Sequence, residues 1–150
     1  MTIKPSLQTL AVGYLARREY SRLELEKKLA EHAPQTPEAL SEALDALEQR
    51  GLLSAERVVE QVLHGRRHKY GAQRIRHELK EKGIAEHLID TAMIDLKGSE
   101  LAAARAVWRR KFGVIPETLK ERSKQARFLA GRGFSAEIVR QVLACSYEDV

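Results

Sequence analysis

A spacing of 50 residues between matching apolar and glycine positions is the feature that most constrains the fold of this chain. Leu25 and Leu29 are matched 50 residues later by Ile75 and Leu79. The next step of 50 residues gives the pairs Leu79 and Leu129, Gly83 and Gly133, Ile84 and Phe134, Ile89 and Val139, and Met93 and Leu143. Because glycines recur in register with the apolar residues, the pattern predicts three copies of one structural unit.

Each unit is predicted to contain three helices, because apolar residues recur at helical spacing between capping signals. Ser21 and Glu24 have the spacing of a capping box. Thr36 and Pro37 are typical of an N-cap and first helical residue. The expected helices cover residues 7–18, 21–33, 36–51, 54–64, 71–83, 84–96, 99–111, 117–130 and 135–144.

The predicted fold is therefore all-α, with three tandem three-helix repeats stacked into an elongated, curved array. Aromatic residues make up only 5% of the chain, so each repeat has a modest aliphatic core and needs its neighbours for stability. The expected divisions are residues 1–53 for the first repeat, 54–97 for a basic second repeat and 98–150 for a basic third repeat.

The charge of the chain is distributed unevenly along its length. Residues 1–60 hold 8 basic and 10 acidic side chains, whereas residues 61–150 hold 18 basic and 11 acidic ones. Such a basic region is typical of proteins that bind nucleic acid, an acidic protein surface or an anionic membrane. We expect residues 61–150 to hold most of any nucleic-acid affinity and the first repeat to act mainly through protein contacts.

The first basic cluster lies at residues 66–84. Its candidate binding residues are Arg66, Arg67, Lys69, Arg74, Arg76 and Lys80. Helical spacing pairs Arg74 with Glu78 and His77 with Glu81, but it places Arg76 next to Lys80 without an acidic neighbour. That edge is predicted to bind an anion, and the alternative is an ordinary solvated helix face.

A second basic cluster follows in the third repeat. Its candidate binding residues are Arg105, Arg109, Arg110, Lys120, Lys124 and Arg127, flanked by Lys111 and Arg122. Two clusters in successive repeats predict one continuous track for phosphate groups, with an affinity that falls steeply as salt rises. Nothing in either cluster predicts the reading of particular bases.

The sequence contains no recognisable catalytic or cofactor motif. His64 and His68 have the spacing of a helical metal pair, but Gly65 is expected to break the helix between them. Cys145, the single cysteine, has no nearby histidine and is interpreted as a bystander thiol, and Trp108 as a core residue packed with Leu101 and Ala104. We therefore expect no enzyme activity, no metal and no cofactor. A single cysteine and the lack of a signal peptide or membrane span favour a reducing, cytoplasmic location.

Several segments, in order and spacing, carry a resemblance to a known family. They are residues 15–21 with Leu25 and Leu29, residues 51–54, Tyr70-Gly71 with Arg74-Ile75, Glu78-Leu79 and residues 82–84, and finally residues 124–129 and 132–134. Over nearly the whole chain the sequence resembles the RecX family, regulatory proteins of the bacterial RecA recombinase.

The resemblance implies a monomer that binds the RecA–DNA filament in its groove and modulates the recombinase in DNA repair, recombination and the SOS response. Its main effect would be to inhibit strand exchange, ATP turnover and co-protease activity. The implied partners are the RecA filament and single-stranded DNA. The chain would bind the DNA either through the filament or, weakly, by itself, and no membrane binding is expected. The alternative from the residues themselves is a transcriptional regulator that binds DNA through a helix-turn-helix.

Overall fold

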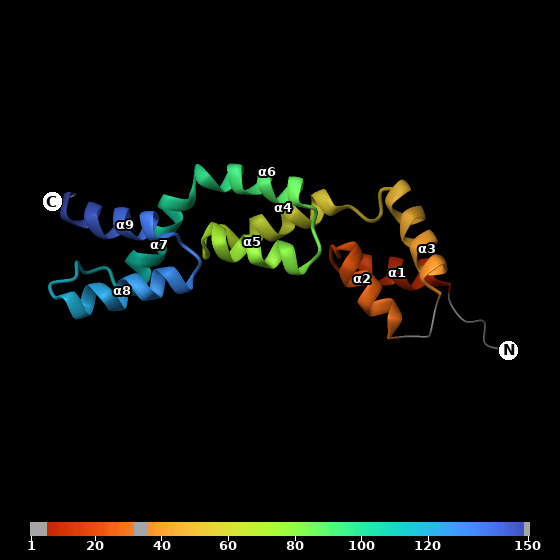
Figure 1. Ribbon diagram of the computed structural model, residues 1–150, viewed down its shortest axis with the longest axis horizontal. Coiled ribbons are helices and arrows are strands. Elements are labelled where there is room, and N and C mark those ends of the chain that lie inside the picture. The colour runs from red at the N-terminus through yellow and green to blue at the C-terminus, as the bar shows by residue number, and fades with distance from the viewer. Residues whose placement is uncertain (1–5, 32–35, 149–150) are drawn as a thin grey trace.

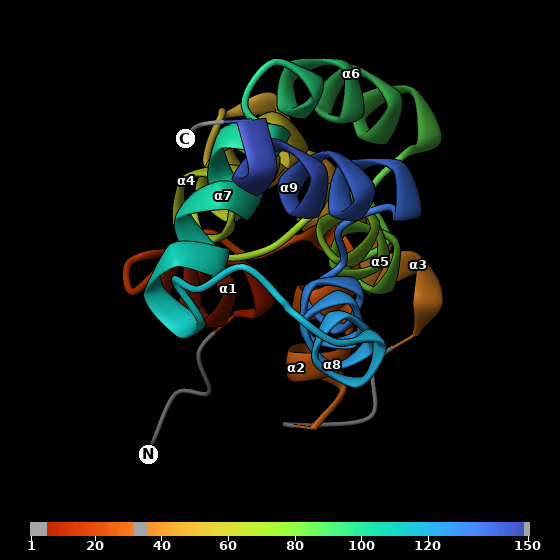
Figure 2. The same ribbon diagram turned by 90° about the vertical axis from the view of Figure 1, so that its left-hand side faces the viewer.

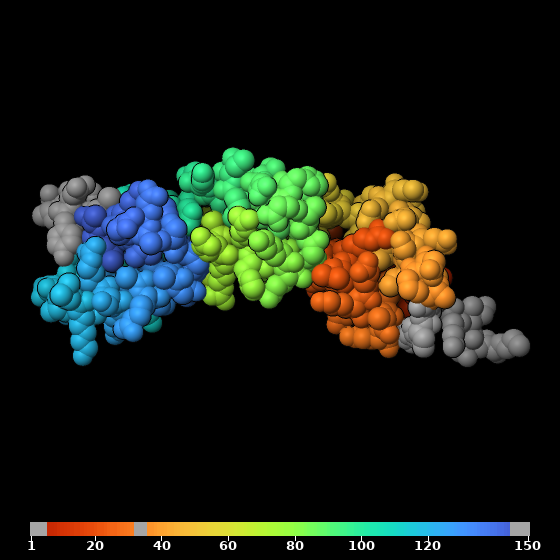
Figure 3. All heavy atoms as spheres, viewed as in Figure 1, coloured from red at the N-terminus to blue at the C-terminus, as the bar shows by residue number. Residues whose placement is uncertain are grey.

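The chain forms nine helices and no strand in the part that the computed structural model describes, residues 6–31 and 36–148, with side chains described as far as residue 144. The helices are α1 (Leu7–Leu15), α2 (Arg22–Ala30), α3 (Pro37–Gln49), α4 (Ala55–Arg66), α5 (Ala72–Glu81), α6 (Glu86–Lys97), α7 (Glu100–Lys111), α8 (Leu119–Gly131) and α9 (Ala136–Glu148). Three groups of three helices follow one another along the long axis of the molecule (Figures 1 and 3). The predicted all-α array of three-helix repeats is confirmed.

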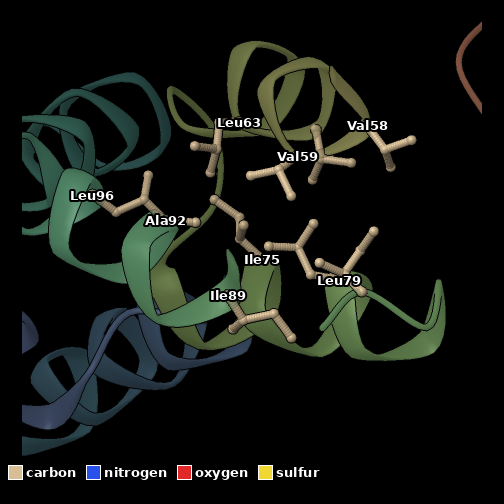
Figure 4. Close-up of a cluster of buried hydrophobic side chains, with 10 residues drawn as sticks. Val58, Val59, Leu63, Ile75, Leu79, Ile89, Ala92 and Leu96 are labelled. Atoms are coloured by element: carbon tan, nitrogen blue, oxygen red, sulfur yellow. The ribbon is translucent and has the colours of Figure 1, made fainter. Parts of the chain in front are cut away.

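Each group of helices surrounds its own cluster of buried side chains. In the middle group, Val59 of α4, Ile75 and Leu79 of α5, and Ile89 of α6 point toward one another (Figure 4). Separate clusters fill α1–α3 and α7–α9. Small separate cores are typical of repeat proteins, in which each unit depends on its neighbours for stability. We retain residues 1–53, 54–97 and 98–150 as the proposed limits of the repeats.

The 50-residue spacing corresponds to equivalent places in α2, α5 and α8. Leu29, Leu79 and Leu129 are all fully buried, one in each of these helices. Gly83 and Gly133 follow α5 and α8 with φ angles of 76° and 94°, a left-handed conformation that glycine adopts without strain. The repeat alignment inferred from the sequence therefore places the same helix in the same position of each unit.

The expected capping signals also form. The Ser21 hydroxyl accepts a hydrogen bond from the Glu24 N–H, and the Ser21 N–H donates to the Glu24 carboxylate at 3.0 Å. Thr36 and Ser54 cap α3 and α4 through their side chains. Each cap satisfies an N–H group that the first turn of a helix leaves without a backbone partner.

Helix limits differ from the prediction at several ends; α8, for example, begins at Leu119 rather than at residue 117. The first helix ends at Leu15 rather than at residue 18, and Arg18 instead lies 3.6 Å above the ring of Tyr20. The prediction that Gly65 breaks its helix is wrong, because α4 continues through Gly65 to Arg66. A glycine costs a helix only about 1 kcal/mol relative to alanine, and the buried face of α4 outweighs that cost.

The row formed by α8, α5 and α2 joins the three repeats end to end (Figures 1 and 2). The Gly71 N–H, at the start of α5, donates to the Arg132 carbonyl after α8 at 2.8 Å, and the Gln73 N–H donates to the Gly133 carbonyl at 3.2 Å. The start of α5 therefore receives the carbonyl end of α8, which is a favourable arrangement of the two helix dipoles. At the other junction, Gly83 after α5 lies against Leu23 of α2.

Candidate functional site

A groove lies on the surface where the second repeat meets the third. It has a volume of about 390 Å³ and is lined by Lys69, Tyr70, Val107, Arg110, Lys111, Phe128 and Arg132. We call this site the junction groove. Four of its seven lining residues are cations and none is acidic, so it combines positive charge with two aromatic side chains.

Three elements bring these residues together. Lys69 and Tyr70 belong to the turn between α4 and α5. Arg110 and Lys111 lie in the last turn of α7, three and four residues after the buried Val107, and therefore on the same face of that helix. Phe128 and Arg132 come from the end of α8. The end-to-end contact of α8 with α5 thus builds the groove.

Two of the four cations of the junction groove, Lys111 and Arg132, lie over its aromatic rings, and so does Arg74 of α5. The Arg132 guanidinium is 5.2 Å from the ring centre of Tyr70 and 5.2 Å from that of Phe128. Arg74 covers Tyr70 at 4.1 Å, and the Lys111 ammonium lies 5.3 Å from the centre of Phe128. Cation–π contacts of this kind are worth about 0.5–1 kcal/mol at exposed sites. They hold the positive groups in place without neutralising them.

The structure divides the predicted binding residues into three sets. The exposed ones are Lys69, Arg74, Lys80, Arg109, Arg110, Lys120, Lys124 and Arg127. Those paired with an acidic side chain are Arg66 with Glu78, Arg67 with Asp95 and Arg76 with Glu86. Arg105 is half-buried on α7. Of the two clusters, the structure brings Lys69 and Arg110 together in the junction groove.

The predicted charge pattern on α5 is partly wrong. Arg76 is paired with Glu86 of α6 at 2.8 Å, so it is not the cation without an acidic neighbour that the spacing predicted. Glu78 is paired with Arg66 at 3.1 Å rather than with Arg74. These partners come from neighbouring helices, which spacing within one helix does not reveal. The predicted pair of His77 with Glu81 is confirmed at 2.9 Å.

Arg132, Tyr70 and Phe128 of the junction groove were not among the predicted binding residues. They lie outside both charge-based selections, although all three belong to segments that carry the family resemblance. A sequence signal did exist, because the 50-residue spacing matches Arg132 with Lys82 and Phe128 with Glu78. A position-by-position comparison of the repeats therefore shows that the third repeat has an aromatic residue, Phe128, where the second repeat has an acid, Glu78.

The remaining chemical candidates lie in ordinary surroundings. Trp108 is in the core of the third repeat with Leu101 and Ala104, as predicted, and its indole N–H donates to the Gln125 side chain at 2.8 Å. No group of three histidine, cysteine, aspartate or glutamate side chains that could hold a metal occurs in the described part of the chain. The side chain of Cys145 lies outside the described residues. None of the described helices is both long and apolar enough to span a membrane.

Comparison with known proteins identifies the family. The model of the second three-helix domain of RecX matches residues 56–93, and the model of the third matches residues 99–143. The regulatory protein RecX of Leptothrix cholodnii is 46% identical over 92% of this chain and 87% of its own length. That of Ralstonia nicotianae is 43% identical over 92% of this chain and 86% of its own.

A solved structure has the same fold. The crystal structure of RecX from Lactobacillus salivarius superposes with a TM-score of 0.79 at 19% identity, covering 92% of each chain. The fold defines an all-α repeat protein with a basic groove between its second and third units. The chain belongs to the RecX family of regulatory proteins.

Proposed function

We propose that this chain binds the filament that RecA forms on DNA, and that it mainly inhibits the recombinase, ATPase and co-protease activities of that filament. Support comes from membership in the RecX family of regulatory proteins. The observation that carries the proposal is the acid-free junction groove beside the exposed cations of α7 and α8. A protein–DNA filament presents phosphate and protein surface together, and an elongated array has room to contact both.

Some cations of the first repeat are paired with its own acids. Arg22 pairs with Asp45 at 2.7 Å and with Glu48 at 2.8 Å, and Arg18 pairs with Glu24 at 3.0 Å. Residues 1–60 hold 8 basic and 10 acidic side chains in total, whereas residues 61–150 hold 18 basic and 11 acidic ones. This contrast supports a division in which the second and third repeats face nucleic acid and the first repeat contributes protein contacts.

Co-sedimentation with RecA assembled on single-stranded DNA tests the proposed function directly. We expect the chain to sediment with the filament as a monomer and to reduce ATP turnover and strand exchange. Failure to sediment at low salt would contradict the proposal. Footprinting on random duplexes is the companion measurement, because protection of one defined sequence would instead favour a helix-turn-helix transcriptional regulator.

A pair of matched lysine substitutions tests the division between repeats. Lys120→Gln with Lys124→Gln removes two exposed charges from α8, and Lys27→Gln with Lys28→Gln removes one exposed and one half-buried charge from α2. Each phosphate contact with single-stranded DNA adds about 0.7 to the slope of log affinity against log salt. The α8 variant is expected to lower that slope by about 1.4, whereas the α2 variant leaves it almost unchanged. Equal losses in both variants would mean that the first repeat belongs to the nucleic-acid surface.

A further inference from the structure

We propose that the junction groove is a specific site for a backbone phosphate of nucleic acid, and that the matching groove at the first junction is silenced by internal ion pairs. The inference deepens the proposed function and rests on it for the identity of the ligand. It assigns the phosphate contact to one place along the array, the junction between the second and third repeats, and not to the basic surface in general.

The chemistry of the junction groove suits a phosphate group. A guanidinium carries five N–H donors in a planar fork that matches two phosphate oxygens, and lysine adds a point charge. Arg132 lies between the rings of Tyr70 and Phe128, and its Nη1 atom donates to the Lys69 carbonyl at 3.5 Å. The rings restrict the guanidinium, so less side-chain freedom is lost when an anion binds.

A groove in the equivalent position lies at the junction between the first and second repeats, but its lining includes an acidic side chain. This first-junction groove has a volume of about 300 Å³ and is lined by Arg18, Gln61, Val62, Gly65, Arg66, Glu78 and Lys82. Val62 and Val107 both lie eight residues after the N-cap serine of their helix, on the buried face. Lys82 corresponds to Arg132 in the 50-residue spacing. The two grooves are therefore repeats of one structural feature.

Acidic side chains neutralise the first-junction groove. Glu78, which replaces Phe128, forms an ion pair with Arg66 at 3.1 Å. Glu24 of α2 contacts Lys82 at 3.2 Å and Arg18 at 3.0 Å. Each cation lining this groove thus has an acidic partner, whereas the junction groove has no acid in its lining. The junction groove would therefore attract a phosphate. In the first-junction groove, the carboxylates would offset the attraction of the cations for a phosphate.

Glu24 also remains ionised over a wide pH range. Burial acts to raise its pKa, but hydrogen bonds from the Ser21 N–H and the Arg18 and Lys82 side chains outweigh burial and lower the pKa below its ordinary value. A lowered pKa on folding means that the charge, and the stability it contributes, persists above the ordinary carboxyl range and is lost only in stronger acid. The ion pairs of Glu24 with Arg18 and Lys82 therefore persist at neutral pH.

Substitution of Arg132 tests the site. Its backbone carbonyl, which accepts the hydrogen bond from Gly71, is kept in Arg132→Gln. Binding is measured by fluorescence anisotropy with a labelled oligothymidine and with a labelled duplex of equal length. We expect about a tenfold loss of affinity for the oligothymidine and a decrease of about 0.7 in its salt slope. The matched control Arg140→Gln removes one exposed charge from α9, outside the groove, and should change affinity less than twofold.

A second variant tests the silencing of the first junction. Glu78→Gln removes the carboxylate that pairs with Arg66, so it should raise oligothymidine affinity about threefold. An unchanged affinity would show that the Glu78 carboxylate does not prevent phosphate binding in the first-junction groove. A loss confined to the duplex in Arg132→Gln would assign the groove to paired nucleic acid. Competition by a polyglutamate peptide that is stronger than competition by unlabelled oligothymidine would overturn the phosphate assignment in favour of an acidic protein segment.

The groove and the proposed function can fail independently. If Arg132→Gln binds oligothymidine like the unmodified chain, while the unmodified chain still sediments with RecA filaments, the groove assignment falls and the function stands. If Arg132→Gln loses oligothymidine affinity but the unmodified chain does not sediment with filaments, the groove stands and the filament function falls.

Discussion

Gly133→Ala is expected to destabilise the protein by about 2–5 kcal/mol and to loosen the contact between the second and third repeats. Gly133 has a φ angle of 94°, a region where a side chain costs about 1–2 kcal/mol. A Cβ atom there would lie 2.5 Å from the Cβ of Arg74 and 2.7 Å from its backbone nitrogen. Overpacking of that kind adds typically 1–3 kcal/mol. Urea denaturation followed by circular dichroism measures the loss.

The neighbouring glycine provides the control. Gly131 lies two residues earlier, within α8, and no atom lies within 4 Å of a Cβ built on it. Alanine is a better helix former than glycine by up to about 1 kcal/mol, so Gly131→Ala should leave stability unchanged or raise it. If the two variants were equally stable, the close contact of the repeats at Gly133 would not determine the stability of the array.

The elements that sequence analysis predicted well are those determined by nearby residues. The capping box of Ser21 with Glu24, the burial of Leu29, Leu79 and Leu129, and the cores of the repeats all follow from spacing within a single helix or repeat. Local signals of this kind need no knowledge of how one helix packs on another. For that reason the repeat architecture could be predicted from the sequence.

The charge pairing could not be predicted in the same way. Glu78 lies four residues from Arg74 but is bound by Arg66 from the preceding helix, and Arg76 is bound by Glu86 from the next one. Choosing between such partners requires the packing angles of α4, α5 and α6. The two exposed basic clusters were visible in the sequence, whereas the pairs that neutralise some of their members became visible only in three dimensions.

The third repeat contains an insertion that the simple spacing hides. The N-cap residues Ser54 and Ser99 are 45 positions apart, but the buried positions Ile75 and Gln125 are 50 apart. Five additional residues therefore lie between these two positions: two in the connection from α7 to α8 (residues 112–118, against 67–71 between α4 and α5) and three at the start of α8, which has 13 residues against 10 in α5. The Gln125 side chain of α8 holds that connection by donating a hydrogen bond to the Val114 carbonyl at 3.0 Å. The polar residue at position 125, where the other repeats have Leu25 and Ile75, is explained by this longer connection.

Gln125→Leu is expected to destabilise the protein by about 1–3 kcal/mol, although it restores the apolar residue that the repeat pattern predicts. Gln125 is 7% exposed and accepts a hydrogen bond from the Trp108 indole at 2.8 Å. Leucine would leave that buried donor without a partner, and an orphaned buried donor costs about 1–3 kcal/mol. The emission of Trp108, the single tryptophan, follows both unfolding and the local change.

A double-mutant cycle separates the hydrogen bond from the change in side-chain shape. Trp108→Phe with Gln125→Leu removes donor and acceptor together. The loss of stability in the double variant should therefore be smaller, by at least about 1 kcal/mol, than the sum of the losses in the two single variants. Additive losses would contradict the argument that the indole hydrogen bond explains a polar residue at this position. The bond also connects α7, which carries Arg110 and Lys111, to α8, which carries Phe128 and Arg132. Gln125→Leu should therefore weaken oligothymidine binding even under conditions where the variant is fully folded, because the two walls of the junction groove lose one of the contacts that connect them.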